Sequence, residues 1–386
     1  MKWVFWFSAA LLAYTYAGYP AWLWVRSRLR YRPVKSASSA PSVSIVMIVR
    51  NEAAALERKL KNLLSLDYPV GSSEIVVVSD GSNDATNTIL DYFAADGRIR
   101  ILVNPASRGK AACLNDAVAA ARGEIVLFTD ARQQVESGAL RLLVDAFADP
   151  EVGCASGELM LGDPVAGEHI RGMGLYWRVE KSVRQMESAS ASVVGATGAI
   201  YAVRKSLIVP VPASTILDDV YIPMHVVRQG FRVVFIPEAR AWDVADQGHE
   251  REFSRKVRTL SGNYQLLQLA PWLLSSRNPI RFEFISHKLL RLLAPFLLVT
   301  MFVSSLVLPQ MFFRAALLSQ VVFYALGVLA ILKLTRGPWT RIADAARTFM
   351  VLNAAASVAF IKFILGREVA WAASQPEQTR ASVQVG

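Results

Sequence analysis

The sequence is poor in two residue types that commonly bind metals or form disulfides, because its 386 residues include only two cysteines and four histidines. The cysteines, Cys113 and Cys154, lie far apart and lack the spacing of metal ligands. A disulfide-rich scaffold and a zinc finger are therefore excluded. We expect both thiols to be structural and the chain to face a reducing compartment.

Three further patterns are absent. No G-x-G-x-x-G follows the first predicted strand, which argues against a Rossmann dehydrogenase, and no internal repeat is found. Aromatic and basic residues do not interleave as they do in proteins that stack nucleic-acid bases. The net charge of +11 therefore does not predict a nucleic-acid partner. Much of the basic excess lies beside apolar segments, where it would bind an anionic membrane leaflet.

Long runs without charge are present instead, and 53% of the residues are hydrophobic. Trp3–Val25 is long enough to cross a bilayer core of about 30 Å. Only Lys2 precedes this run, whereas five cations follow within residues 26–35. Positive flanks stay in the cytoplasm, so residues 1–35 are predicted to be an anchor that starts outside. A cleaved signal peptide, the alternative, would carry its charge before the apolar run.

Two more runs near the other end, Leu292–Phe313 and Ala315–Leu332, predict a membrane hairpin that turns near Pro309-Gln310. A third run, residues 348–361, either spans or lies in the interface, and we favour a span. We expect an interfacial segment over 271–291, two to three membrane helices over 292–366 and a polar tail over 367–386. The protein is thus predicted to be a multi-pass protein of the cell (inner) membrane.

Residues 36–270, between these ends, alternate between predicted strands and helices. Val43–Val49 and Glu74–Ser79 are short runs rich in β-branched residues, which is typical of buried parallel strands. Leucines at helical spacing lie between them. Two more strands are predicted over 99–103 and 124–129. The pattern predicts a cytoplasmic α/β domain with a mostly parallel central sheet and helices on both faces.

Carboxylates follow the ends of three predicted strands. Glu52 comes after the first strand, Asp80 after the second and Asp130 after the fourth, at the edge where open α/β sheets bind nucleotides. Capping explains some of this pattern, because Asn51 is a plausible N-cap for the next helix. Asp80 has no such role, because Ser82–Asp84 can cap the helix that follows it. We therefore favour a ligand-binding role for Asp80.

Charged residues of a second group lie at predicted helix ends. Lys110 precedes a helix, where a cation is unfavourable unless an anion binds there, although a solvated lysine is an equal alternative. Asp218 and Asp219 repel each other, which can raise the pKa of one towards that of a catalytic base. Arg255 and Arg258 would share one helix face, suited to a diphosphate or to a membrane surface.

Taken in order, these motifs resemble those of the inverting family 2 glycosyltransferases of the membrane, which include cellulose, hyaluronan and poly-N-acetylglucosamine synthases. The resemblance runs from about residue 42 to 267, and residues 285–291 also resemble bacterial exopolysaccharide enzymes. It rests on Asn51-Glu52, Ser79-Asp80-Gly81-Ser82, Gly109-Lys110, Asp130, Gly198, Asp218-Asp219 and Arg255-Lys256-Val257-Arg258-Thr259. It implies the GT-A fold for the α/β domain.

The resemblance also implies a role for each residue. The nucleotide sugar would be bound by four residues, Glu52, Asp80, Lys110 and Asp130. Asp219 would be the general base, with Asp218 in place of the usual glutamate beside it. Gly198 would lie in the acceptor-binding turn, and Arg255 and Arg258 would steady the diphosphate. A divalent ion, Mg²⁺ or Mn²⁺, would be held by Asp130.

This sequence departs from the family pattern at two motifs. Arg132 replaces the second acid of the D-x-D motif, which puts the metal requirement in doubt. The Q-x-x-R-W motif retains only Arg255 and Arg258, and it lacks the tryptophan that usually accompanies processive polymerisation. His249, close to this segment, is either a metal ligand or, more simply, a surface histidine.

The expected activity is inverting transfer of a sugar from a nucleotide sugar, by resemblance a UDP-sugar, to a growing polysaccharide. The alternative is transfer of one sugar to a lipid or glycolipid. A third interpretation is a catalytically silent membrane subunit, which Arg132 keeps open. The partners would be the donor, a polysaccharide or lipid-linked acceptor, the lipid bilayer and an accessory export subunit.

Overall fold

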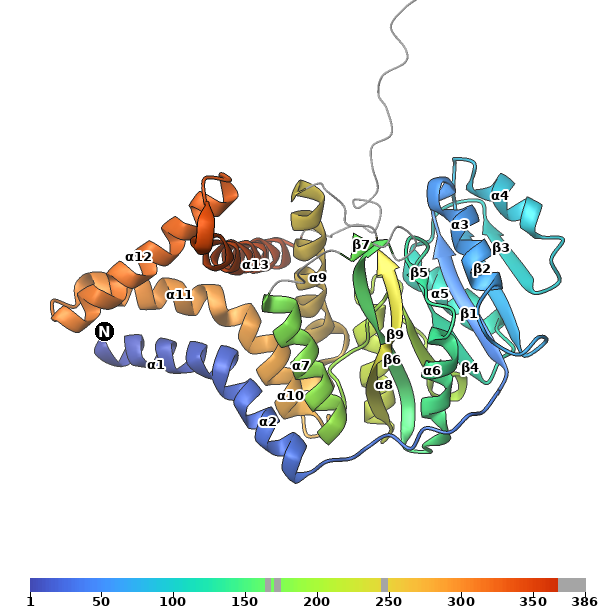
Figure 1. The fold of residues 1–386 in the computed structure, drawn as a ribbon, viewed down its shortest axis with the longest axis horizontal. Helices are drawn as coiled ribbons and strands as arrows, with labels where there is room; N and C mark the ends of the chain where they lie inside the picture. Colours follow the sequence, from blue (N-terminus) through green and yellow to red (C-terminus); the bar gives the residue numbers. More distant parts are fainter. Residues whose placement is uncertain (164–167, 170–174, 244–248, 367–386) are drawn as a thin grey trace, which may run out of the picture.

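The computed structural model describes residues 1–163, 168–169, 175–243 and 249–366. A domain built around a sheet lies to one side, and a group of long helices projects from it (Figure 1). The predicted tail over 367–386 lies outside the described residues.

Nine strands of the described residues form one mixed sheet in the order β3-β2-β1-β4-β8-β6-β9-β5, with β7 paired to β6. They are β1 (Val43–Val49), β2 (Ser73–Asp80), β3 (Ile99–Asn104), β4 (Ile125–Phe128), β5 (Gln134–Val135), β6 (Val152–Asp163), β7 (Glu168–His169), β8 (Tyr201–Arg204) and β9 (Arg232–Asp243). The first four strands are parallel, as predicted. The sheet is nevertheless mixed, because β8 runs antiparallel to both of its neighbours, β4 and β6.

Both faces of the sheet are covered by helices. Every residue of β1 is buried, and its side chains alternate between two cores. Ile45 and Met47 join the core that contains leucines of α3, whereas Val46 and Ile48 join the core that contains residues of α5 and α8. The helices of this domain are α3 (Ala53–Leu64), α4 (Thr86–Phe93), α5 (Lys110–Ala120), α6 (Ala139–Asp145), α7 (Leu175–Ser190), α8 (Asp218–Arg228) and α9 (His249–Leu269).

The two cysteines are free and buried, as predicted. Cys154 lies on β6, and Cys113 lies on the face of α5 that packs against the sheet. Both side chains belong to the same hydrophobic core.

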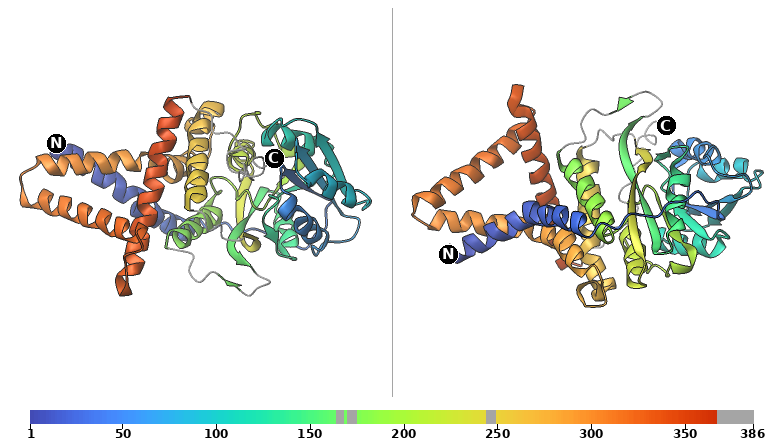
Figure 2. Two further views of the ribbon diagram at one scale, coloured as in Figure 1. Left: turned by 90° about the horizontal axis from the view of Figure 1, so that it is seen from above. Right: turned by 60° about the horizontal axis from the view of Figure 1, so that its bottom comes forward.

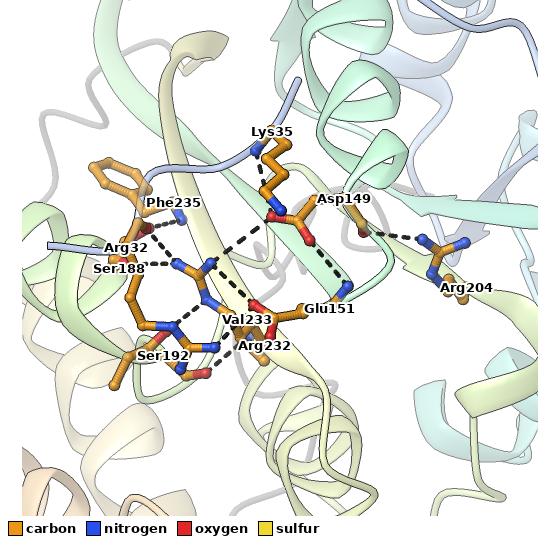
Figure 3. Close-up of polar contacts among 11 residues, drawn as sticks. Arg32, Lys35, Asp149, Glu151, Ser188, Ser192, Arg204, Arg232, Val233 and Phe235 are labelled. Carbon is orange, nitrogen blue, oxygen red and sulfur yellow. Dashed lines mark hydrogen bonds and ion pairs between the residues drawn. The ribbon is translucent and has the colours of Figure 1, made fainter. Parts of the chain in front are cut away.

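An arginine ties the segment after the N-terminal helices to the sheet (Figure 3). The guanidinium of Arg232, at the start of β9, donates hydrogen bonds to the carbonyl oxygens of Arg32 (2.9 Å) and Ser188 (3.0 Å). It also lies 3.9 Å from the carboxylates of Asp149 and Glu151. The nearly buried guanidinium of Arg232 thereby provides hydrogen-bond and ion-pair partners to polar groups from three segments that are distant in the sequence.

Three helical stretches are long and apolar enough to cross a membrane, as judged over the described residues. They are Arg281–Val307, which contains α10 (Arg281–Phe284), a π-helical turn and α11 (Leu290–Val307), then α12 (Met311–Ile331) and α13 (Thr340–Ile364). Helices α11 and α12 form the two arms of the predicted hairpin, and its crossing of the membrane stays a prediction. Helix α12 begins before Arg314, so this arginine lies inside the helix rather than between the two.

The N-terminal helix is not among these three. It consists of α1 (Lys2–Ala13), a π-helical turn at Tyr14–Gly18 and α2 (Tyr19–Leu29). It nevertheless runs along α11. The rings of Phe5 and Phe313 are 4.9 Å apart, and the Ser8 hydroxyl lies 2.9 Å from that of Thr300. The N-terminal anchor therefore stays a prediction.

Helix α13 lies across the α11–α12 hairpin rather than alongside it, as both views in Figure 2 show. Ala355 and Ala359 of α13 are buried against Val257 and Tyr264 of α9. Because α9 belongs to the sheet domain by sequence, this contact places one end of α13 beside that domain. The interfacial alternative for this helix thus remains open.

Candidate active site

Four of the predicted residues meet where β4 ends. Lys110, Asp130, Gly198 and Asp218 line a cavity of about 10 Å³, which has room for about one water molecule. Apolar residues of β1 and β4 form its floor. The sequence-predicted cation and acids are thus brought together from strand and helix ends that are distant in the sequence.

Lys110 is held between two acids. Its Nζ lies 3.2 Å from Asp130 Oδ1 and 3.3 Å from Asp218 Oδ1. Burial lowers the pKa of Lys110, but the charges of Asp130, Asp218 and Asp219 more than offset this and hold the pKa above its ordinary value. The sequence predicted that this helix-start cation needs an anion, and the protein's own carboxylates supply it.

Asp218 and Asp219 are the first two residues of α8. Burial and the neighbouring Asp218 raise the pKa of Asp219 to about 6, although the charges of Lys110 and Lys288 oppose the rise. The backbone N–H of Gly198 donates to Asp219 Oδ2 at 3.1 Å. A carboxylate with this pKa is suited to accept a proton near neutral pH.

The turn that contains Gly198 has little room for a side chain. A Cβ at position 198 would lie 3.1 Å from Asp219 Oδ2. The backbone N–H of Ala196 in the same turn donates to the carbonyl oxygen of Asp219 at 2.7 Å. The turn therefore fixes both the backbone and the carboxylate of Asp219.

Asp80 has a structural role that the sequence reasoning missed. Its buried carboxylate accepts hydrogen bonds from the backbone N–H of Arg108 (2.6 Å) and Gly109 (3.0 Å) and from the Ser107 hydroxyl (2.8 Å). Burial raises the pKa of Asp80, but these hydrogen bonds more than offset it, and the pKa lies below its ordinary value. Asp80 thus shapes the loop that presents Lys110, and its contact with a nucleotide stays a prediction.

Glu52, not Asn51, is the N-cap residue of α3, so the predicted cap is wrong by one position. The capping acceptor comes from another loop, because the N–H of Ala53 donates to Asp84 Oδ2 at 3.2 Å. The carboxylate of Glu52 instead binds Arg132, whose Nε lies 3.2 Å from Oε1. The residue that replaces the second acid of D-x-D is therefore paired with the acid that follows β1.

The residues present can offer a divalent ion one protein ligand, the carboxylate of Asp130. Asp130 has a side chain that is 44% exposed, and Lys110 engages its Oδ1. In the part of the chain that the structure describes, no three His, Cys, Asp or Glu side chains are grouped to hold a metal. Mg²⁺ is typically bound by one or two carboxylates together with substrate phosphates, so Asp130 can supply one ligand. The side chain of His249 lies outside the described residues.

Arg255 and Arg258 lie on the first half of α9 and outside the lining of the small cavity. Arg255 is exposed and Arg258 is half-buried. Their helix nevertheless contacts the segment before the acid pair, because a Cβ on Gly262 would lie 2.6 Å from the side chain of Leu217. Their role in binding the diphosphate stays a prediction.

Lys59 is a buried cation that the sequence analysis did not identify. Its Nζ donates to Thr129 Oγ1 at 2.8 Å and to the carbonyl oxygen of Gln133 at 2.7 Å, on either side of Asp130. Burial lowers its pKa to about 7. A signal was available, because Lys59 falls on the same helix face as Leu56 and Leu63.

A larger hollow, of about 360 Å³, lies at the end of α2, and Arg26, Arg30 and Arg232 are among the residues that line it. None of the predicted site residues lines this hollow. We therefore assign the candidate site to the strand ends, where the carboxylates converge, rather than to this hollow.

Comparison with known proteins identifies the domain. Residues 44–208 match the family model "Glycosyl transferase family 2". The chain is 34% identical over 132 residues to the beta-monoglucosyldiacylglycerol synthase of Nostoc sp., covering 33% of this chain and 28% of that protein. It is 22% identical over 252 residues to the poly-beta-1,6-N-acetyl-D-glucosamine synthase of Staphylococcus aureus, covering 63% of this chain and 60% of that protein. The chain thus spans less than two thirds of the length of either relative.

The fold is shared with a solved structure over almost the whole chain. The mannosyltransferase PcManGT from Pyrobaculum calidifontis, solved in complex with GDP-Man and Mn²⁺, superimposes with a TM-score of 0.73 at 22% identity, covering 95% of this chain and 100% of that chain. The resemblance found in the sequence is confirmed: the chain contains a glycosyl transferase family 2 domain with the GT-A fold.

Proposed function

We propose that this protein is an inverting glycosyltransferase that transfers a sugar from a nucleotide sugar, by resemblance a UDP-sugar, to a growing polysaccharide at the membrane. The observation that carries the proposal is the Asp219 carboxylate, with its pKa raised to about 6, held by the N–H of Gly198. The charges of Lys110 and Asp130 act on this carboxylate.

The reaction is a single displacement at the anomeric carbon. Asp219 accepts the proton of an acceptor hydroxyl, and the hydroxyl oxygen forms a bond to the anomeric carbon. The bond from that carbon to the diphosphate oxygen breaks on the opposite face, so the configuration inverts and a nucleoside diphosphate leaves. The hydrogen bond from Gly198 keeps the carboxylate oriented towards the acceptor.

Positive charge must stabilise the departing diphosphate. Lys110 lies 3.2 Å from Asp130 at the strand ends, and Arg255 and Arg258 are proposed to add charge from α9. Asp130 and the donor's phosphates would hold a Mg²⁺ or Mn²⁺ ion, which neutralises charge on the leaving group when it is bound. The complex of PcManGT with Mn²⁺ supports testing this ion here.

Transfer of one sugar to a lipid or glycolipid is the second candidate. Two observations favour it: the relative from Nostoc is named as a glycolipid synthase, and the tryptophan associated with processive enzymes is replaced by Thr259. A silent subunit is less favoured, because Lys110, Asp130 and Asp219 are all retained in one site.

The test is radiolabel transfer by membranes that contain the full chain, with UDP-glucose, UDP-N-acetylglucosamine and GDP-mannose as donors. We expect transfer that Asp219→Asn abolishes and that Asp67→Asn, at an exposed surface acid, leaves unchanged. Gel filtration of the product separates a polymer from a lipid that carries one sugar. Equal transfer by wild type and Asp219→Asn would refute the catalytic assignment.

A further inference from the structure

The position normally occupied by the second acid of D-x-D carries a cation in this chain. Arg132 and Glu52 form a two-point contact, in which Nε lies 3.2 Å from Oε1 and 3.3 Å from Oε2 of the carboxylate. Nη2 also lies 3.2 Å from Oε1. The pair joins the loops after β1 and β4, two neighbouring parallel strands.

Arg132 keeps capacity for a further partner. Its side chain is 39% exposed, whereas that of Glu52 is 17% exposed. A guanidinium has five N–H donors, and the contact with Glu52 uses only those at Nε and Nη2. Phosphate oxygens are well suited to such a donor set.

The pair is also held by a framework that leaves Glu52 free for Arg132. The N-terminus of α3 is capped by Asp84 from the next loop, and the N–H of Glu52 donates to Thr86 Oγ1 at 3.0 Å. The carboxylate of Glu52 therefore does not cap α3. Its contact with Arg132 fixes the direction of the guanidinium before any ligand binds.

Two lysines lie close to Asp130 or its loop. Lys110 forms an ion pair with it, and Lys59 lies beneath its loop, bound to Thr129 and Gln133. The charge of Lys110 is balanced by Asp130, Asp218 and Asp219. Arg132 adds a cation to this strand edge, and its side chain is the more exposed member of its pair with Glu52.

From these contacts we propose that Arg132, oriented by Glu52, binds the donor's diphosphate directly, so that nucleotide binding does not require a divalent ion. This inference rests on the proposed function, because it assigns the diphosphate of the donor to that site. It makes Arg132 a binding residue and Glu52 the residue that positions it.

The test measures binding rather than turnover. UDP and GDP are titrated by calorimetry into the purified full chain in detergent, with EDTA or with Mn²⁺. We expect the Kd of the wild type to differ by less than about threefold between the two conditions. Arg132→Gln should weaken binding in EDTA by about tenfold or more, because it removes a charged hydrogen bond. Arg132→Asp should bind only with Mn²⁺, because it restores the second acid.

The matched control is Arg141→Gln. Arg141 lies 3.2 Å from Asp67 with a side chain 38% exposed, so the control removes a similar surface pair elsewhere. If Arg132 serves structure alone, both glutamine variants would lower the melting temperature and leave the Kd unchanged, which would overturn the inference. Wild-type binding that needs Mn²⁺ would also overturn it and leave the proposed function intact. Failure of either nucleotide to bind under any condition would count against both.

Discussion

The pKa of Asp219 is about 6 because two opposing effects act on it. Burial and the charge of Asp218 raise the pKa, whereas the charges of Lys110 and Lys288 lower it. As a base it acts only when deprotonated. The value of kcat/KM for sugar transfer should therefore fall as the pH drops below 6, by about tenfold per pH unit well below that value. The measurement is kcat/KM between pH 5 and 8. A rate independent of pH over this range would contradict the assignment.

Removing Lys110 should shift this dependence in a defined direction. Its positive charge lowers the pKa of Asp219, so Lys110→Met should move the acidic limb of the profile to higher pH, in addition to weakening donor binding. Lys61→Met, at an exposed lysine of α3, should leave the limb in place. A limb that moves to lower pH in Lys110→Met would show that another group controls it.

Gly198 should be sensitive to the smallest side chain. A Cβ there would lie 3.1 Å from Asp219 Oδ2, closer than a relaxed contact, so the carboxylate must shift by a few tenths of an ångström. We expect Gly198→Ala to lower kcat by about tenfold, because small misplacements of a catalytic group are costly. The control is Gly138→Ala, where no atom lies within 4 Å of the added Cβ. Equal activity of both variants would show that the turn tolerates the shift.

At the scale of elements, the first four strands could be predicted because they are short, largely apolar runs, and β1 and β4 are buried along their whole length. The direction of β8 could not, because Tyr201–Arg204 pairs with strands distant in the sequence and nothing in its four residues sets a direction. The cap of α3 was misplaced for the same reason, since its acceptor, Asp84, comes from another loop. The pairing of Arg132 with Glu52 likewise depends on β1 and β4 lying side by side.

Lys59 links α3 to the end of β4, and the link should make stability depend on pH. Its pKa in the folded protein is lowered from 10.5 to about 7, so between these values the unfolded chain binds more protons than the folded one. Stability should therefore rise with pH across this window, by at most about 1.4 kcal/mol per pH unit from this group. Lys59→Met should show a smaller rise in melting temperature between pH 7 and 9.5 than wild type.

The exposed Lys61, in the same helix, provides the comparison for this effect. Lys61→Met should retain the pH dependence of the wild type, because the ammonium of Lys61 is largely in solvent. Identical pH profiles for wild type and Lys59→Met would mean that Lys59 stays charged in the folded protein.

At the scale of the whole molecule, the start of the chain lies beside the α11–α12 turn (Figure 1). Phe5 packs with Leu308 and Phe313, the residues on either side of that turn. The basic residues that follow α2 lie at the opposite end of the N-terminal helix. Since positive flanks stay in the cytoplasm, both the chain start and the turn are expected outside, with the site domain inside.

This arrangement predicts which positions a membrane-impermeant maleimide reaches in intact cells. Cys113 and Cys154 are buried, so the native background should be low. Gln310→Cys, in the exposed α11–α12 turn, should react from outside, whereas Lys333→Cys, after α12, should react only once the cells are opened. The reverse labelling pattern would show that the orientation in the membrane is the opposite of the predicted one.

The variant Lys362→Cys tests the placement of α13. This helix lies across the hairpin (Figure 2), and its Ala355 and Ala359 pack on α9, so we expect labelling only in opened cells. Labelling from outside would mean that α13 spans the membrane.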